Sequence, residues 1–487
     1  MDGWTSRTIS CMIKQLIKDV AIYGVASSIG KFIGLFLVPI YTRIFSPEEY
    51  GVIDLISTVV VLVSILGMAQ LESSVSRYYY TAKEEHERRL YVSTAFWAII
   101  GLSVFWTLGL VAVADHISQL LFKTIDYNKI IIVSAMIIPA SNLYSYLSVV
   151  MRYLKKPLMY SVFVIVQMLA SVGLSIWLVV YERLGIIGVF YGQLLGFIIG
   201  TVFQLFYLRF LLSFSFQMNM LRKFFRYGLP MVPAVAGGWA NSYVSRFVIV
   251  GYLTLADVGI YTVALKIASV FQLIDNAFRM AWGPFMWENF EKENHRDIYR
   301  HIMKFISIFV FFIIGVFALF SKELLMLLTT PNYMKAASLT GMIAFSIGLT
   351  IISQIIGLGP GITKRTEFNT LIYFISVGAN IACLLIMVPK IGLIAVPLSL
   401  LIGTTATVLL GWYNSERLYY IGFSKAFFFI AYMVTALSVG ISLRTETSII
   451  VKMSAIFFTI AIYSIMIFMG KKPLFSWKYV LRGLKNG

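Results

Sequence analysis

Four basic residues lie inside stretches that are otherwise apolar enough to cross a membrane: Lys31, Arg246, Lys266 and Arg279. A cation at the centre of a bilayer costs at least about 2.5–3.5 kcal/mol even on the mildest scale. Four such cations facing lipid would cost roughly 10 kcal/mol. We therefore expect these side chains to face a bundle interior or a water-filled cavity. A cavity lined by cations is suited to binding an anion.

Three carboxylates share the same apolar stretches: Asp54, Glu72 and Asp275. Asp275 and Arg279 stand four residues apart and so lie on one face of a helix, where they can form an ion pair. A purely structural role for that pair is as reasonable as a functional one. For the other three cations, pairing with Asp54, with Glu72 or with a backbone carbonyl is the alternative to binding an anion.

Basic and aromatic residues meet in the sequence Ser76-Arg77-Tyr78-Tyr79-Tyr80. A basic residue beside aromatic rings at a membrane interface is ordinarily an anchor. Contact with a lipid headgroup is the alternative role for Arg77.

The sequence has no arrangement typical of an enzyme or of a metal site. Its four histidines are scattered, and none has a partner at the spacing of metal ligands: His86, His116, His295 and His301. It contains no Walker A sequence and no nucleophile elbow. We therefore predict a protein that is not an enzyme and that has no catalytic residue, no metal and no other cofactor.

The composition is that of a polytopic membrane protein. Of the 487 residues, 59% are hydrophobic and 13% are charged. Soluble globular chains are about 45–50% apolar and about 25% charged. The net charge of +18 is explained by basic loops that face anionic lipid headgroups. Because no nucleic-acid-binding motif accompanies this charge, nucleic acid is not an expected partner.

Fourteen stretches are long enough to span a bilayer, since a transmembrane helix needs about 20 mainly apolar residues. Backbone polar groups must be satisfied inside hydrocarbon, so these stretches are predicted to be helices. They cover residues 20–42, 51–76, 91–113, 129–151, 157–180, 186–208, 228–251, 258–286, 302–320, 334–358, 368–388, 392–413, 424–443 and 449–469. Arg246 and Lys266 lie at comparable depths in adjoining predicted helices, so we expect these two cations to lie close together.

Basic residues are divided unevenly between the two sides of the predicted bundle. Lys and Arg favour the side of both termini by roughly three to one, and basic loops mark the cytoplasmic side. The sequence therefore predicts a multi-pass protein whose two termini are cytoplasmic.

The first twelve predicted helices form two similar halves. Gly51 and Gly259 are 208 residues apart, and each follows a short turn. The basic pairs at 155–156 and 364–365 are 209 residues apart. Six helices per half is an even number, so the halves have the same topology about an axis along the membrane normal. The predicted domains are two six-helix lobes, residues 1–215 and 216–415, and two additional helices with a basic tail, residues 416–487.

One predicted helix, 186–208, carries a glycine at every fourth position: Gly188, Gly192, Gly196 and Gly200. Residues at this spacing share one face of a helix. Small residues let membrane helices approach closely, so this face is predicted to pack against another helix.

Several motifs together resemble those of the polysaccharide-unit flippases (Wzx type). They are Tyr23-Gly24 before an apolar helix, Phe45-Ser46-Pro47-Glu48-Glu49-Tyr50-Gly51, Arg77-Tyr78-Tyr79 and, in the second half, Asp257-Val258-Gly259-Ile260-Tyr261. This family belongs to the superfamily that also holds the multidrug and toxic compound extruders and the peptidoglycan-precursor flippases. The resemblance covers nearly the whole chain.

The resemblance implies an all-α polytopic membrane protein in which two six-helix lobes surround a cavity with alternating access. It implies an isoprenoid-pyrophosphate-linked oligosaccharide that moves from the inner to the outer leaflet of a bacterial or archaeal cell membrane. In such families, cations in helices 1, 2, 7 and 8 meet the pyrophosphate. By helix and residue type, this role falls to Lys31, Arg246, Lys266 and Arg279. A polysaccharide polymerase and chain-length machinery are the implied protein partners.

The second predicted helix departs from the family pattern, because its ionisable residues inside the span are Asp54 and Glu72 rather than a cation. These carboxylates, together with Asp275, are candidates to couple transport to a counterflow of Na⁺ or H⁺. The membrane potential is an alternative driving force, since it favours outward movement of negative charge by about 2.3 kcal/mol per charge per 100 mV.

Three other functions are weighed against the flippase. A cation-coupled multidrug exporter of the same fold would need carboxylates in its cavity to bind organic cations. This chain instead has more basic than acidic residues inside its predicted spans. A membrane polysaccharide polymerase would need a sizeable external loop, whereas the predicted external loops are short. A structural scaffold would not be expected to carry cations in mid-membrane.

Overall fold

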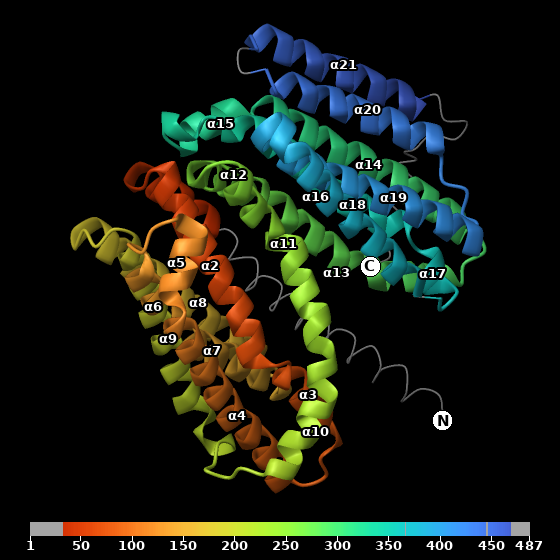
Figure 1. The fold of residues 1–487 in the computed structure, drawn as a ribbon. Helices are drawn as coiled ribbons and strands as arrows, with labels where there is room; N and C mark the ends of the chain where they lie inside the picture. The colour runs from red at the N-terminus through yellow and green to blue at the C-terminus, as the bar shows by residue number, and fades with distance from the viewer. Residues whose placement is uncertain (1–32, 366, 445–446, 469–487) are drawn as a thin grey trace, which may run out of the picture. The chain divides into compact units, whose positions relative to one another are not determined.

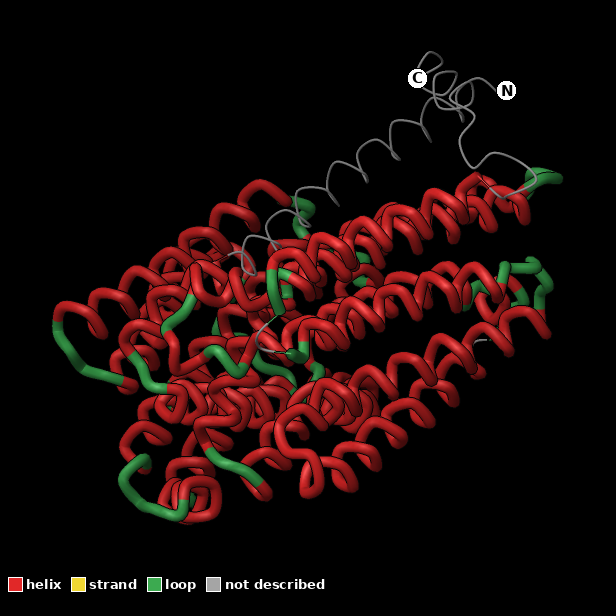
Figure 2. Tube along the Cα trace, turned by 90° about the horizontal axis from the view of Figure 1, so that it is seen from above, coloured by secondary structure: helices red, strands yellow, loops and turns green. Residues whose placement is uncertain are grey.

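The computed structural model describes residues 33–365, 367–444 and 447–468. Within these ranges the chain is helical, with short loops and no strand (Figures 1 and 2). The predicted all-α polytopic fold is confirmed. The chain divides into two compact units, residues 1–259 and 260–487. This division does not test the domain boundaries expected from the repeat, which remain predictions.

The helices of the first unit begin with an apolar helix at Ile33–Ile44. They continue with α2 (Pro47–Met68), α3 (Leu71–Thr81), α4 (Glu85–Ala112), α5 (Ala114–Phe122), α6 (Asn128–Ala135), α7 (Ile137–Tyr153), α8 (Pro157–Ile176), the π-helix η1 (Trp177–Tyr181), α9 (Ile186–Leu208), η2 (Arg209–Leu211), α10 (Met218–Gly228), η3 (Leu229–Met231) and α11 (Val232–Tyr252).

The chain passes from the first unit to the second within α12 (Leu255–Ala268). The second unit continues with α13 (Val270–Phe290), α14 (His295–Leu319), α15 (Ser321–Leu328), η4 (Pro331–Tyr333), α16 (Ala336–Ile356), α17 (Gly359–Ile362), α18 (Glu367–Ile391), η5 (Gly392–Ile394), α19 (Ala395–Leu418), α20 (Lys425–Ser442) and α21 (Ile449–Phe468).

Each of the fourteen predicted spans has a helical counterpart in the described part of the chain. Ten segments are long and apolar enough to cross a membrane, and one of them, Glu367–Leu418, contains both α18 and α19. The other spans correspond to the helix Ile33–Ile44, to α11, and to α12 with α13. The last two are bent by 42° at Ser269, so the span predicted for 258–286 is formed by two helices with a break between them.

The repeat is visible in rare backbone conformations. Lys155 and Lys364 have positive φ angles of 53° and 60° at the turns before α8 and α18. Gly185 and Gly392 have positive φ angles of 60° and 67° at the turns after these helices. A left-handed conformation is uncommon for lysine, so its use at matched positions is a specific signature. The predicted relation between the two halves is therefore confirmed at these turns.

Both repeated hairpins start their second helix with the same capping arrangement. At α2, Glu49 N–H donates to Ser46 Oγ (3.2 Å), and Ser46 N–H donates to the Glu49 carboxylate (2.8 Å). At α12, Thr254 and Asp257 make the same two bonds, each 3.2 Å. Such reciprocal bonds satisfy N–H groups that a helix start leaves unpaired. With these capping bonds, α2 begins at Pro47 and α12 at Leu255, earlier than the predicted residues 51 and 258. Both helices therefore start within segments that were predicted to be turns.

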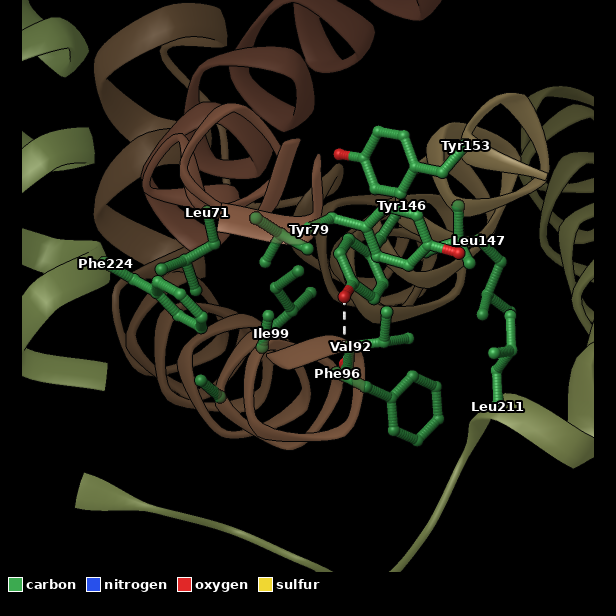
Figure 3. Close-up of a cluster of buried hydrophobic side chains, with 14 of the residues drawn as sticks. Leu71, Tyr79, Val92, Phe96, Ile99, Tyr146, Leu147, Tyr153, Leu211 and Phe224 are labelled. Atoms are coloured by element: carbon green, nitrogen blue, oxygen red, sulfur yellow. Dashed lines mark hydrogen bonds between the residues drawn. The ribbon is translucent and has the colours of Figure 1, made fainter. Parts of the chain in front are cut away.

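The core of the first unit lies where α3, α4, α7 and α10 converge (Figure 3). Leu71 of α3, Ile99 of α4 and Phe224 of α10 are completely buried there. Tyr146 of α7 is also completely buried, and its hydroxyl donates a 2.8 Å hydrogen bond to the carbonyl of Val92 in α4. Burial of each large apolar side chain contributes about 1.5–3 kcal/mol, so this cluster holds the four helices together.

The glycine face of α9 packs closely against α8, as the four-residue spacing predicted. A Cβ added at Gly192 would lie 2.3 Å from the backbone nitrogen of Ser175. A Cβ added at Gly196 would lie 2.5 Å from the Cα of Ser171. Both distances are far below van der Waals contact, so any side chain at these positions has to push the two helices apart.

We expect Gly196→Ala to lower the free energy of unfolding by about 1–3 kcal/mol, the usual cost of overpacking. Gly173→Ala is the matched control, because Gly173 lies in α8 with open space around its Cβ position. That control should be neutral or stabilising by up to about 1 kcal/mol. The measurement is thermal unfolding of the purified protein in detergent, and equal midpoints for the two variants would contradict the prediction.

α16 is the central helix of the second unit, where it packs against α13, α14, α19 and α20. Phe345 of α16 contacts Phe311 of α14 edge to face, with ring centroids 5.6 Å apart. It also contacts Tyr432 of α20 at 4.9 Å. Helix α20 lies beyond residue 415, where the predicted second lobe ends, and these rings attach it to α14 and α16.

An ion pair between a buried lysine and a half-exposed glutamate holds α21 to α15. Lys452 is only 2% exposed, and its ammonium group donates a 2.5 Å hydrogen bond to the carboxylate of Glu323. The same group lies 5.6 Å from the ring centroid of Phe320. No local sequence pattern indicates this pairing, because the two residues are 129 positions apart.

Acid is expected to weaken the attachment of α21. Burial by itself would raise the pKa of the Glu323 carboxyl, but hydrogen bonds from Lys452 and from the backbone lower it below the ordinary 4.5. A carboxyl whose pKa is lowered by folding stabilises the fold above its unfolded pKa and loses this effect as the pH falls through its folded pKa. We therefore expect the unfolding midpoint of the wild type to exceed that of Glu323→Gln at neutral pH, and the difference to shrink below pH 4.5.

Glu85→Gln is the control for this pH series. Glu85 pairs with Arg89 at 2.9 Å, but both side chains are largely exposed. Exposed pairs contribute about 0–1 kcal/mol, so this variant should unfold nearly as the wild type does at every pH. A wild-type advantage over Glu323→Gln that persists unchanged into strong acid would contradict the assignment.

Candidate functional site

Three of the four predicted cations can be placed, because Lys31 lies outside the described residues. Arg246 lies on α11 in the first unit, whereas Lys266 on α12 and Arg279 on α13 belong to the second. Lys266 is partly buried. The side chain of Arg279 is 61% exposed. The proximity expected for Arg246 and Lys266 stays a prediction.

Arg246 is held by Asp54 across two helices from different halves of the repeat. Its Nε donates to Asp54 Oδ2 at 3.1 Å, and its Nη1 donates to the carbonyl of Ser242 at 2.5 Å. The guanidinium also lies 5.0 Å from the ring centroid of Tyr243. Arg246 is 8% exposed, and removing one partner of such a buried pair costs about 3–5 kcal/mol. Pairing with Asp54, the structural alternative for this cation, is thus present in this conformation.

The starts of α2 and α12 touch through two glycines at matched positions of the repeat. A Cβ on Gly51 would lie 2.1 Å from the carbonyl oxygen of Leu255. A Cβ on Gly259 would lie 1.9 Å from the carbonyl oxygen of Pro47. The contact is therefore reciprocal, and neither position has room for a side chain. Asp54 follows Gly51 by less than one helical turn, so the ion pair to Arg246 lies beside this contact.

Asp275 joins α13 to α16 in the second unit. Its carboxylate accepts hydrogen bonds from Gln354 Nε2 (2.6 Å) and from Thr350 Oγ1 (3.4 Å). Arg279 Nη2 donates to it at 3.1 Å, which confirms the ion pair predicted from the i,i+4 spacing. Sequence reasoning missed Gln354 and Thr350, because no local pattern relates them to Asp275.

Arg77 lies in α3, about one turn before its C-terminal end, with an exposed side chain. Its guanidinium lies 5.0 Å from the ring centroid of Tyr227, which is close enough for a cation–π contact. An exposed cation over an aromatic ring is compatible with both roles expected from the sequence. Interfacial anchoring and contact with a headgroup therefore remain predictions.

Glu72 lines a cavity of about 410 Å³ whose walls come from α2, α3, α7 and α9. Its Oε2 is buried and has no hydrogen-bond partner among the described residues. The polar residues of the wall include Ser64, Gln70, Ser141, Asn142 and Gln193. Apart from Glu72, sequence reasoning singled out none of them, because Ser, Asn and Gln are not unusual in membrane helices that pack together.

The chain breaks its helix beside this cavity. Ala69 and Gln70, between α2 and α3, have positive φ angles of 47° and 56°. For residues other than glycine this conformation costs about 1–2 kcal/mol each. The predicted span 51–76 therefore contains a break after Met68, which the sequence does not indicate because neither Ala nor Gln is a helix breaker. Backbone strain of this kind is concentrated at functional sites.

Comparison with known proteins begins with a family model described as "Polysaccharide biosynthesis protein", which matches residues 40–338. The chain is also similar to the succinoglycan biosynthesis transport protein ExoT of Rhizobium meliloti (strain 1021), with 26% identity over 275 residues. That alignment covers 53% of this chain and 50% of the relative. The match therefore spans about half the length of the curated relative.

Two solved structures share the fold. One is the lipid II flippase MurJ in an inward closed conformation, with a TM-score of 0.73 and 14% identity over 92% of this chain and 98% of that chain. The other is an inward-facing multidrug resistance transporter of the MATE family, with a TM-score of 0.61 and 14% identity over 80% of this chain and 94% of that chain. At such low identity these likenesses concern the fold alone.

Proposed function

Since the chain belongs to the polysaccharide biosynthesis protein family, we propose that this multi-pass membrane transporter flips an isoprenoid-pyrophosphate-linked oligosaccharide. The cargo is proposed to move from the inner to the outer leaflet of a bacterial or archaeal cell membrane, with both termini of the chain in the cytoplasm. A polysaccharide polymerase and chain-length machinery are proposed to use the delivered repeat unit.

The observation that carries the proposal is the buried pair of Arg246 and Asp54. A guanidinium presents a planar fork of N–H donors that matches phosphate oxygens two at a time. A pyrophosphate carries more negative charge than one carboxylate, so it competes with Asp54 for Arg246. Binding of the headgroup would thus exchange one anion for another at Arg246 and would leave no buried cation without a partner.

The same exchange supports alternating access. Loss of the Asp54–Arg246 pair would loosen α11 from α2 next to the contact between Gly51 and Gly259. Because the two glycines have no side chains to interlock, we propose that this contact can separate and re-form. We propose that it is closed in the conformation described here and opens when the cargo is released.

The other proposed headgroup contacts are Lys31, Lys266 and Arg279, with Arg77 as a contact on the cytoplasmic side. The exposure of Arg279 supports such a role, since its guanidinium can be reached while Asp275 keeps it in place. Multidrug export is less well supported, because Asp54 and Asp275 are both paired with arginines. An organic cation would have to displace one of these arginines or be bound by Glu72 alone.

The test is flipping of a fluorescent isoprenoid-pyrophosphate glycan in proteoliposomes by the wild type, Lys31→Ala and Arg246→Ala. We expect Arg246→Ala to lose flipping and Lys31→Ala to flip more slowly than the wild type. The corresponding isoprenoid monophosphate glycan and a fluorescent organic cation serve as competing cargoes. Unimpaired flipping by both variants would refute the cationic headgroup site. Transport of the organic cation without the glycan would assign multidrug export instead.

A further inference from the structure

We infer that the cavity beside the break between α2 and α3 binds a monovalent metal cation, Na⁺, with Glu72 as its charged ligand. The inference rests on the proposed transport function, because it assigns the coupling ion to one place in the first unit. It also separates Glu72 from the two other carboxylates that the sequence made candidates for coupling, Asp54 and Asp275.

The three carboxylates differ in how their charge is balanced. Asp54 accepts a hydrogen bond from Arg246 at 3.1 Å. Asp275 accepts hydrogen bonds from Arg279 and from Gln354. Glu72 makes no ion pair among the described residues, and its buried Oε2 has no hydrogen-bond donor there. A buried carboxylate oxygen needs a proton, a donor or a metal cation, and of the three carboxylates it is Glu72 whose described partners supply none of these at one oxygen.

The charges around Glu72 do not replace such a cation. Arg152 of α7 attracts the carboxylate electrostatically, but its side chain is exposed, so solvent and salt screen its charge. The hydroxyl of the neighbouring Tyr153 donates to the backbone carbonyl of Glu72 at 2.8 Å, not to its carboxylate. Among the described residues that line the cavity, Glu72 is the single ionisable one. When the Glu72 carboxylate is ionised, the cavity therefore carries one net negative charge, which matches a monovalent cation.

The wall also offers neutral oxygen ligands, which small hard cations prefer. Asn142 is 4% exposed and uses its amide nitrogen to donate to the carbonyl of Ser64 and to Ser103 Oγ. No described residue donates to its amide oxygen, which stays available as a ligand. The hydroxyl of Ser141 donates to the carbonyl of Ile138, so its oxygen lone pairs are available as well.

The helix break brings these groups to one place. Gln70 and Glu72 both line the cavity, although residues two apart point to different sides of a continuous helix. The end of α2 also leaves its last carbonyl groups without helical donors, and unwound carbonyls of broken membrane helices are known cation ligands. Gly67 lets this end of α2 approach α7, because a Cβ there would lie 2.8 Å from Asn142 Nδ2. The strained conformation at Ala69 and Gln70 thus brings ligand groups for the proposed cation to one cavity.

The experiment measures Na⁺ binding to the purified full-length chain in detergent, in the absence of any glycan. Radioactive Na⁺ binding and the thermal unfolding midpoint are recorded in NaCl, KCl and choline chloride of equal ionic strength, at neutral and at mildly acidic pH. The wild type should bind Na⁺ saturably and unfold at a higher temperature in NaCl than in choline chloride. Glu72→Gln, which keeps the side-chain shape, should weaken Na⁺ binding by about ten-fold or more.

Two further variants serve as controls. Glu72→Asp retains the charge and should restore part of the Na⁺ response. Glu323→Gln removes a carboxylate from the second unit and should bind Na⁺ as the wild type does. Equal Na⁺ binding by the wild type and Glu72→Gln would overturn the proposal. A third outcome is that acid stabilises the wild type but not Glu72→Gln, while Na⁺ stabilises neither protein. That result would overturn the Na⁺ site and assign a proton to Glu72 instead. The absence of both responses would leave a site for water only and would equally overturn it.

The binding measurement is independent of the cargo. A protein that binds Na⁺ through Glu72 but does not flip the glycan would refute the proposed function and leave the cation site standing. A protein that does not bind Na⁺ and flips the glycan equally well with and without Na⁺ would refute the cation site and leave the proposed function standing.

Discussion

Replacing Arg246 by alanine is expected to abolish flipping of the pyrophosphate-linked glycan. The substitution leaves the carboxylate of Asp54 buried without its partner, which costs about 3–5 kcal/mol. It also removes the fork of donors proposed to bind the pyrophosphate. Both effects are large, so we expect a loss of flipping together with a lower unfolding midpoint. Flipping is measured in proteoliposomes and unfolding in detergent.

The double variant Asp54→Asn with Arg246→Met separates these two effects. It removes both charges at similar volume, and buried ion pairs replaced in this way are often neutral for stability. We expect its unfolding midpoint to recover while flipping stays lost. Wild-type flipping by the double variant would rule out a headgroup role for Arg246. Arg89→Ala, which breaks the exposed pair with Glu85, should leave both measurements unchanged.

Adding one methyl group at Gly51 or Gly259 is expected to slow flipping strongly. The new Cβ would lie 2.1 Å or 1.9 Å from a backbone carbonyl oxygen of the partner hairpin, and backbone cannot swing aside as a flexible side chain can. Overpacking of this kind costs about 1–3 kcal/mol, which changes an equilibrium between two conformations by about 5–150-fold. Gly51→Ala and Gly259→Ala should therefore disfavour the closed junction.

The opening is measured with a cysteine in place of Val258, which is completely buried, after Cys11 and Cys383 have been replaced by serine. A maleimide that cannot cross membranes should label this cysteine faster in the glycine variants than in the parent. Gly251→Ala is the control, since the Cβ position of Gly251 has open space around it. Slow labelling and normal flipping in Gly51→Ala and Gly259→Ala would contradict a gating role for this contact.

Glycine positions in the sequence predicted two features of the structure, a close helix contact and the internal repeat. The four-residue glycine spacing predicted the close contact of α9 with α8, because helical periodicity alone places those residues on one face. The match of Gly51 with Gly259 predicted the repeat, and the shared capping bonds and positive φ angles confirm it. The direct contact between these two glycines could not be predicted, since it depends on how the two hairpins pack.

The charged residues show the limit of local reasoning. The pair of Asp275 with Arg279 followed from the geometry of one helix. The pair of Asp54 with Arg246 joins residues 192 positions apart, and the bond from Gln354 to Asp275 joins residues 79 apart. No local spacing relates such residues, so the sequence could name Asp54 as one of several possible partners and could not choose among them.

The sequence by itself determined that this chain is an all-helical, multi-pass membrane protein, and its resemblance to the polysaccharide-unit flippases is confirmed by the family match. The physical reason is that hydrocarbon requires long apolar helices, whose length and composition can be counted along the chain. The tertiary structure decided which buried charges are paired, where a helix breaks without a helix-breaking residue, and that Glu72 lines a cavity and has a buried oxygen without a partner. These features arise from packing between distant segments, which local periodicity does not encode.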